Sequence, residues 1–352
     1  MTRYLGGLIT KDESLVIPAD NYENTSAPGV WTLEEAQMLA KQGLWPTVGN
    51  SQRGIFGGGY TTGFGTNTMS YIAITSTGNA SDFGDLTAST YGPAAFSSST
   101  RGVFGGGANS DLEALNIIEY VTISNTGNGT DFGDLSVSRW QTTGTSNSTR
   151  GLFAGGNSID FTIDYVTIAS TGNATDFGDL TVRVGRAAST ASSTRALIMG
   201  GQRLGTNRSV TTDYVTIASA GNATDFGDLT AATKTQAQGN ISSGTRGISA
   251  GGDLSSGAGN IIEYFTIAST GNATDFGDLD QVRSNSAGCS NTSRGIIAGG
   301  YSDSGVSLTN GIQYITIAST GNSTNFGDLP SEGGSSALYA VAGCSNAHGG
   351  LN

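Results

Sequence analysis

The stretch Asn79-Ala80-Ser81-Asp82-Phe83-Gly84-Asp85-Leu86 occurs in six close variants along the chain. The copies are centred on the following phenylalanines: Phe83, Phe132, Phe177, Phe226, Phe276 and Phe326. They follow one another at intervals of about 50 residues, a period typical of supersecondary units that must stack on neighbours to bury their faces. The sequence therefore predicts a repeat protein in which no single repeat folds alone.

Each copy belongs to a larger unit whose parts keep one order. In the third repeat, Arg150 opens an apolar segment that ends in a Gly-Gly pair, and a loop then leads to the β-branched and aromatic segment 164–168 and to the copy at 174–180. A segment of small residues, such as 187–193, precedes the next arginine. These segments predict four strands per repeat: a small-residue inner strand, an apolar second strand, an alternating third strand and a short outer strand.

The number of repeats and the way they close can also be predicted. A Gly-Gly pair ends the second strand of every repeat, at residues 58–59, 106–107, 155–156, 200–201, 251–252 and 299–300. The first repeat lacks an inner strand, whereas residues 342–346, Ala-Gly-Cys-Ser-Asn, repeat residues 287–291 after the last repeat. We expect this extra segment to pair beside 53–59, because a propeller closes by joining its two ends and leaving no open edge.

The order of these segments resembles the kelch repeat of β-propellers, over about residues 50–347. One feature departs from that pattern, since the tryptophan usual in the outer strand of kelch repeats is phenylalanine here, as at Phe83. The resemblance implies an all-β fold. We expect a six-bladed, kelch-like β-propeller at residues 51–352, closed by a C-terminal inner strand and preceded by an extended and helical N-terminal arm at residues 1–50.

The N-terminal arm differs in kind from the repeats. Thr32-Leu33-Glu34-Glu35 is a capping box, which predicts a short helix that continues to Gln42. We expect Trp31, Leu39 and Trp45 to anchor this arm. Two alternatives stay open: the helix packs on the propeller, or it docks on another protein, for which exposed tryptophans are suited.

Two stretches add a second resemblance. Residues 27–36, Ala-Pro-Gly-Val-Trp-Thr-Leu-Glu-Glu-Ala, with Gly43-Leu44-Trp45-Pro46, resemble a segment found near the ends of many tailed-phage virion proteins. The sequence of residues 167–180 is similar to segments of virion proteins of marine phages, cyanophages among them. The resemblance implies a virion structural protein made in the host bacterial cytoplasm. Its arm would contact other virion proteins, and we expect a homo-oligomer in the particle.

Composition argues against two classes of partner. The formal net charge of −12 and the absence of a basic stripe do not fit binding to nucleic-acid phosphates or to an anionic membrane surface. No apolar run approaches the roughly 20 residues that cross a bilayer, so we expect no membrane insertion. We expect Cys289 and Cys344, at matching positions of neighbouring inner strands, to be buried thiols.

The ionisable residues that stand out recur in every repeat, whereas a catalytic site is asymmetric. Arginines precede each second strand, at Arg53, Arg101, Arg150, Arg195, Arg246 and Arg294, and aspartates open five outer strands, at Asp82, Asp131, Asp176, Asp225 and Asp275. We expect Arg–Asp pairs or turn hydrogen bonds that join blades. We predict no catalytic residue, no cofactor and no metal, since the chain has a single histidine, His348, and the Asp-x-x-Asp carboxylates of an extended strand point apart.

The loops between the second and third strands differ in every repeat, whereas the turns on the opposite rim are nearly constant. Loops that vary on a fixed scaffold are where binding specificity is built. We therefore predict partner binding at the following residues: Tyr60, Asp111, Glu113, Asp160, Arg203, Arg208, Asp253, Tyr301 and Asp303. The alternative is neutral drift in loops that nothing touches.

Three function classes follow. The first is a phage virion structural protein, a tail or tail-fibre component that displays its propeller for recognition of a host surface glycan or protein. The second is a decoration or connector subunit of the virion without receptor binding. The third is a carbohydrate-active propeller enzyme, which requires two loop carboxylates in one pocket.

Overall fold

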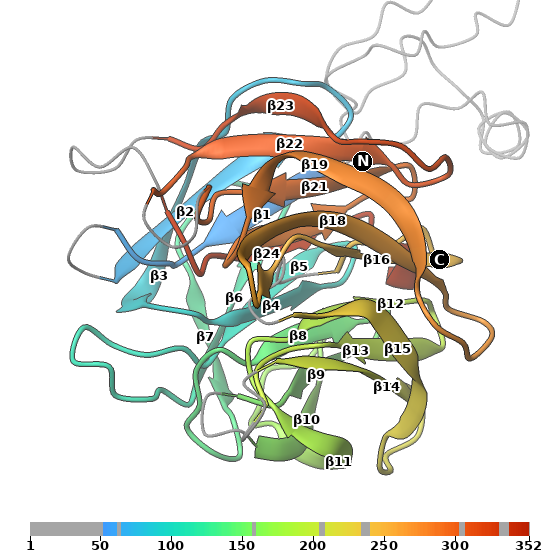
Figure 1. Ribbon diagram of the computed structural model, residues 1–352. Coiled ribbons are helices and arrows are strands. Elements are labelled where there is room, and N and C mark those ends of the chain that lie inside the picture. The colour runs from blue at the N-terminus through green and yellow to red at the C-terminus, as the bar shows by residue number, and fades with distance from the viewer. Residues whose placement is uncertain are drawn as a thin grey trace, which may run out of the picture. The chain divides into compact units, whose positions relative to one another are not determined.

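The computed structural model describes residues 52–61, 65–156, 160–203, 208–233, 240–302, 307–330 and 338–351. In this part of the chain the fold is a six-bladed β-propeller, with six four-stranded antiparallel sheets (Figure 1). The predicted all-β class, the blade number and the strand order are confirmed. The N-terminal arm, with its predicted helix and its anchor residues Trp31, Leu39 and Trp45, lies outside the described residues.

The innermost strands are short and carry small residues. They are β24 (Ala342–Ser345) in blade 1, β4 (Ala94–Ser97), β8 (Thr143–Ser146), β12 (Ala188–Ala191) and, in blade 6, β20 (Ala287–Ser290). In blade 5 the chain at this position makes isolated bridges, from Asn240 to Ser189 of blade 4 and from Ser242 to Gly247 of its own blade.

Each of the six second strands begins at the recurring arginine. They are β1 (Arg53–Gly57), β5 (Arg101–Gly105), β9 (Arg150–Ala154), β13 (Arg195–Met199), β16 (Arg246–Ala250) and β21 (Arg294–Ala298). The third strands are β2 (Thr66–Ala73), β6 (Ile117–Thr122), β10 (Asp160–Thr167), β14 (Ser209–Thr216), β18 (Gly257–Thr266) and β22 (Gly311–Thr316). A two-residue strand, β17 (Asp253–Leu254), pairs with the start of β18.

The outer strands correct one prediction, because four of them are long. These are β3 (Ser81–Thr90), β11 (Thr175–Val184), β15 (Thr224–Thr233) and β19 (Thr274–Arg283), each of 10 residues; β7 (Thr130–Asp134) and β23 (Thr324–Asp328) are short. Register shifts interrupt the pairing of each long strand with its third strand, as between Met69 and Ser70 opposite β3. Such bulges bend the outer strand, which then continues along the edge of the blade.

The ring closes as predicted. β24 pairs antiparallel with β1, with Ile55 opposite Cys344 and Phe56 opposite Gly343. The last strand of the chain thereby completes the first blade, so blade 1 has no open inner edge. Cys289 and Cys344 are buried free thiols, as predicted, and burial raises the pKa of Cys344 to about 12.

The core lies between blades. Phe83 and Leu86 of the repeated stretch pack in one cluster with Val121 and Ile123 of the next blade, and Phe83 meets Tyr71 edge to face. Equivalent phenylalanines are 2% or 3% exposed in all six blades. This packing is consistent with a repeat that cannot fold alone, since each blade buries apolar side chains against the neighbouring repeat.

The inner strands approach so closely that they fill the axis. A Cβ on Gly144 would stand 2.7 Å from the Ala95 carbonyl oxygen, which only glycine avoids. Serine hydroxyls link neighbouring inner strands: Ser146 Oγ donates to the Ser97 carbonyl (2.7 Å) and Ser97 Oγ to the Ser345 carbonyl (2.6 Å). The inner strands are therefore joined around the axis by side-chain hydrogen bonds.

The C-terminal tail continues from β24 into this ring. His348 is 1% exposed and precedes a 3-10 turn, η1 (Gly349–Leu351). Its Nδ1 lies 2.8 Å from Asn240 Nδ2 and its Nε2 lies 3.1 Å from the Ser97 carbonyl. Burial lowers the pKa of His348 to about 4, so the imidazole is neutral near pH 7. We call this buried side chain among the inner strands the His348 plug.

Candidate functional site

The recurring arginines lie on the rim that carries the nearly constant turns, which we call the constant rim. Arg150 Nη1 donates to the Ile217 and Ala218 carbonyls of the next blade, at 3.1 and 2.9 Å, and its guanidinium stacks 4.5 Å above the Tyr165 ring. All six arginines stack on their own blade's tyrosine and donate to the next blade in this way. Of the two predicted alternatives, turn hydrogen bonds that join blades are confirmed.

The repeated stretch is itself a contact between blades. The turn of blade 3 docks on the outer strand of blade 2, where the N–H of Gly172 donates to the Phe132 carbonyl (2.7 Å) and the N–H of Asp134 donates to Asn173 Oδ1 (3.1 Å). Gly133 has φ of 146°, and a Cβ there would stand 2.5 Å from the Gly172 main chain. The constant turns are thus constant because they hold blades together.

Buried acids form a further set of contacts between blades. Glu119, one residue before Tyr120, accepts a hydrogen bond from the N–H of Thr87 in the preceding blade (2.7 Å). Asp164, Asp213, Glu263 and Gln313 accept equivalent bonds from the outer strand of the blade before them. Burial is the largest cause that raises the pKa of Glu119, Asp213 and Glu263.

The exceptions in this set support a structural role. In blade 1 the acceptor position holds Ser70, and the position it would serve is Pro330, which has no N–H to donate. In blade 6 the acceptor is the neutral Gln313, and its donor is the N–H of Asp280 in the outer strand of blade 5 (3.2 Å). A carboxylate at position 313 would lie close to the carboxylate of Asp280. The acceptor side chain therefore differs between blades according to the main-chain donor opposite it.

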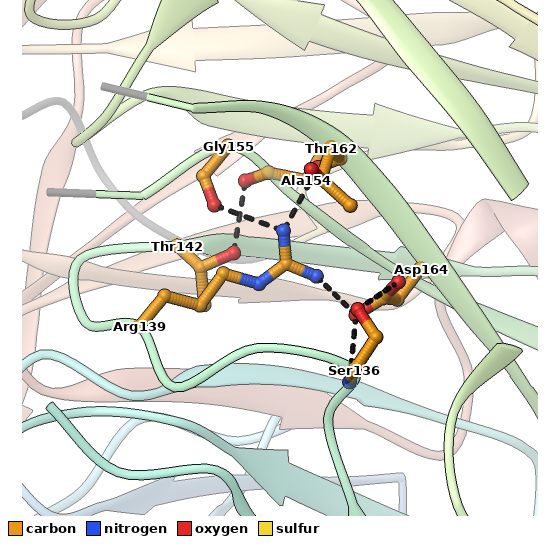
Figure 2. A network of polar contacts seen from close by, with 7 residues as sticks. All are labelled: Ser136, Arg139, Thr142, Ala154, Gly155, Thr162 and Asp164. Atoms are coloured by element: carbon orange, nitrogen blue, oxygen red, sulfur yellow. Dashed lines mark hydrogen bonds and ion pairs between the residues drawn. The ribbon is translucent and has the colours of Figure 1, made fainter. Parts of the chain in front are cut away.

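One of these acids holds a buried ion pair (Figure 2). Arg139, 1% exposed, donates from Nη2 to Asp164 Oδ2 (2.6 Å) and from Nη1 to the Thr162 carbonyl (2.9 Å). Ser136 Oγ donates to the same carboxylate at 2.7 Å. In blade 5 the matching Arg283 donates to the Gly299 and Gly311 carbonyls, and burial lowers its pKa. These groups fix the links between blades and are closed to solvent.

The opposite rim, which we call the variable rim, carries the predicted partner-binding residues. Tyr60 and Tyr301 belong to one aromatic cluster, described below. Arg208 forms an ion pair with Asp253 (2.7 Å), and Arg203 is exposed beside it in a hollow of about 580 Å³.

Asp111 and Glu113 lie apart from these residues, exposed in a turn held by Asn109. The side chain of Asp160 and the whole of Asp303 lie outside the described residues.

The aromatic cluster consists of Tyr60, Tyr91, Trp140, Tyr301 and Tyr339. Their ring centroids form a chain of contacts: Tyr301 to Tyr339 at 4.6 Å, Tyr339 to Tyr60 at 5.3 Å, Tyr60 to Tyr91 at 5.5 Å and Tyr91 to Trp140 at 5.1 Å. All five side chains are partly exposed. Of these five residues only Tyr60 and Tyr301 are predicted from the sequence, because the other three lie in the links between an outer strand and the next inner strand and not in the variable loops.

Among the described residues, five links between an outer strand and the next inner strand are joined in a chain by main-chain hydrogen bonds. Gln141 N–H donates to the Gly92 carbonyl, Arg186 N–H to the Gln141 carbonyl (both 2.8 Å), and Ala340 N–H to the Asn285 carbonyl (2.8 Å). All five residues are left-handed, with φ of 54° at Gln141 and 58° at Arg186. Glycine adopts this conformation without strain, whereas other residues are strained in it, and such strain is often found at functional sites.

These links surround a hollow of about 260 Å³ whose lining includes Tyr91, Arg186, Asp253, Asn285, Tyr301 and Tyr339. Arg186 Nε donates to Gln141 Oε1, and Gln141 Nε2 donates to the Tyr91 hydroxyl (3.0 Å). Burial is the largest cause that raises the pKa of both Tyr91 and Tyr339, so their hydroxyls stay protonated at neutral pH. The hollow therefore presents aromatic faces beside neutral and charged hydrogen-bonding groups.

Within the described ranges, no three His, Cys, Asp or Glu side chains gather as a metal site would require. The same residues contain no helix long and apolar enough to cross a membrane. No protein-family model matches the chain, and a comparison with curated proteins finds no similar sequence.

Proposed function

We propose that this chain is a non-enzymatic structural protein of a tailed-phage virion, a tail or tail-fibre component that displays a kelch-like propeller for recognition of the host surface. The observation that carries the recognition part is the difference between the two rims. Turns of the constant rim are engaged in contacts between blades, as at Gly172 and Asn173. The variable rim instead presents loops that differ in each blade, together with the partly exposed aromatic cluster.

The virion part of the proposal rests on resemblance of sequence. The Gly-Val-Trp-Thr-Leu stretch at 29–33 and the repeated stretch at 167–180 are the segments that carry it. In this proposal the arm, residues 1–50, attaches the propeller to other virion proteins, several copies assemble in the particle, and the variable rim points outward. The partner is a glycan or protein of the host surface.

Competition for the host surface tests the proposal. Host cells are incubated with the purified full-length chain, and adsorption of the phage particle is then measured. We expect adsorption to fall as the concentration of the chain rises. Tyr339→Ala on the variable rim should weaken the competition, whereas Asp82→Ala, at an exposed residue of the constant rim, should leave it unchanged. Unimpaired adsorption with the folded wild-type chain would contradict host recognition.

In the connector alternative the chain has the same propeller and arm, but the variable rim is buried against other virion proteins. For the enzyme alternative, two carboxylates must face one another in an open pocket. Glu119, Asp164 and Glu263 are instead buried and engaged with main-chain N–H groups. No observation favours either alternative over host recognition.

A further inference from the structure

We infer that the hollow at the centre of the variable rim is a binding site for a sugar residue, which stacks on Tyr301 and Tyr339 and receives hydrogen bonds from the residues around them. This inference rests on the proposed function and deepens it, because it names the ligand class and the residues that bind it. Nothing in it requires the propeller to be catalytic.

The aromatic rings supply the first requirement, a partly apolar platform. One face of a pyranose ring is lined by C–H bonds, which meet the negative face of an aromatic ring favourably. The ring centroids of Tyr301 and Tyr339 lie 4.6 Å apart at an interplanar angle of 41°, so the two rings are tilted and do not stack in parallel. Both rings line the hollow and both are partly exposed.

Size supplies the second requirement. The hollow has a volume of about 260 Å³. Pockets that enclose drug-sized ligands begin at roughly 300 Å³, so this one suits a single ring with its substituents and leaves the rest of a chain in solvent. A site that grips one residue of a polymer from an open rim is consistent with a surface glycan.

Charge supplies the third requirement. Arg186 and Asp253 both line the hollow, which therefore holds a guanidinium and a carboxylate whose Oδ1 already accepts a hydrogen bond from Arg208. A quaternary ammonium ligand, which an aromatic cage would otherwise favour, is therefore opposed by Arg186. A neutral ligand rich in hydroxyl groups, which donate and accept, fits both side chains and the amide of Asn285.

The backbone of the links is the independent observation. Arg186 and Asn285 occupy left-handed positions, with φ of 58° and 53°, as Gln141 and Ala340 do in the equivalent links, where Gly92 stands in a fifth. A left-handed conformation is unfavourable for a residue other than glycine, and less so for asparagine. Such strain clusters at ligand clamps, and here it holds polar side chains at the hollow. Arg186 is fixed further by its hydrogen bond to Gln141, and among the described residues its terminal amino groups donate to no other group.

Saturation-transfer NMR on the full-length chain tests the inference, with glucose, galactose, mannose and N-acetylglucosamine as neutral probes and with choline and inorganic phosphate as charged ones. We expect transfer to at least one neutral sugar, and weaker or no transfer to the charged probes. A charged probe that binds more tightly than every sugar would overturn the inference, as would the absence of transfer to all four sugars.

Two variants locate the site. Arg186→Gly removes the side chain at a position that glycine adopts without strain, so the melting temperature should hold while sugar binding falls at least roughly tenfold. Tyr301→Ala should weaken binding to a similar degree. The matched control is Tyr120→Ala, which removes a tyrosine from the constant rim and should lower stability without changing sugar affinity. Binding that survives both Arg186→Gly and Tyr301→Ala would contradict this location.

The outcome separates this inference from the proposed function. Sugar binding by the purified chain, together with unimpaired phage adsorption in the competition experiment, would keep the site and remove the role in host recognition. Competition for adsorption without binding of any sugar probe would keep host recognition and overturn the sugar site.

Discussion

The two rims of this propeller are built from the same six repeats and use them in opposite ways. On the constant rim, the outer strand that contains Gly133 and the turn that contains Asn173 repeat almost unchanged, and they join neighbouring blades. On the variable rim, the link residues Gln141 and Arg186 keep one backbone conformation and differ in side chain. The difference teaches that repetition within a sequence marks where blades hold one another, and that the side chains which differ on a shared backbone mark where a ligand can be recognised.

The largest expected effect comes from removing the closing strand. A chain that ends after residue 337 loses β24, the hydrogen bonds that Ser345 forms with Ser97 and Ser290, and the buried His348. With each lost backbone hydrogen bond costing about 1 kcal/mol, we expect several kcal/mol of destabilisation and a chain that is largely unfolded. Circular dichroism melts measure this, with a chain that ends after Leu351 as the control. An unchanged melting temperature for the shorter chain would contradict closure through β24.

The next effect distinguishes the rims directly. Gly133→Ala places a Cβ 2.5 Å from the Gly172 main chain at φ of 146°, so we expect a loss of roughly 2–4 kcal/mol in the free energy of unfolding. Asp111→Ala, at an exposed turn of the variable rim, should change it by less than roughly 0.5 kcal/mol. Urea denaturation of both variants gives the comparison. Equal losses would mean that the rims do not differ in structural role.

The plug on the axis predicts a pH dependence. The pKa of His348 falls from its ordinary value of 6.5 to about 4, so the unfolded chain binds the proton first as pH decreases. The stability that comes from the neutral imidazole is therefore present above pH 6.5 and lost between that pH and 4, by roughly 3 kcal/mol in all.

His348→Gln removes this contribution. As pH falls from 7 to 4, the free energy of unfolding of the wild type should decrease more than that of the variant. Urea denaturation across that pH range measures both. A difference that stays constant with pH would show that His348 does not titrate with the predicted shift.

The smallest effect concerns the buried acids. The pKa of Glu119 is raised above its ordinary value of 4.5, mainly by burial, so its contribution to stability is full below that pH and is lost as pH rises through the folded value. Glu119→Gln keeps an oxygen acceptor for the Thr87 N–H without the charge, as Gln313 does in blade 6.

We expect Glu119→Gln to leave stability at pH 7 unchanged or slightly raised, whereas Glu119→Ala, which strands the N–H, should cost roughly 1–3 kcal/mol. Thermal melts at pH 7 compare the two. A large loss with Gln would show that the negative charge itself is required.

The sequence predicted the blades and their closure because both depend on periodic features. Gly-Gly pairs and the Phe-Gly-Asp-Leu stretch recur in every repeat, and the second copy of Ala-Gly-Cys-Ser-Asn marks the strand that closes blade 1. The length of the outer strands could not be predicted in this way, because bulges such as that opposite Ser70 shift the pairing without a residue type that marks them.

The candidate site was only partly predicted for the same reason. Tyr60 and Tyr301 follow Gly-Gly pairs and were found as loop residues, whereas Tyr91, Trp140 and Tyr339 lie in links where the equivalent positions of other blades hold Gly185 and Ser284. A residue that appears in some repeats only carries no periodic signal. Tyr339 also contacts Tyr60 and Tyr91, which are distant in sequence, so only closure of the propeller brings these rings together.

Cryo-EM of purified phage particles that carry this chain tests the role of the two rims most directly, by locating the propeller and showing which rim meets solvent. We predict that the variable rim, with the aromatic cluster around Tyr339, faces outward at the tail tip or the end of a fibre. A map in which that rim is buried against other virion proteins would contradict host recognition and make the chain a connector.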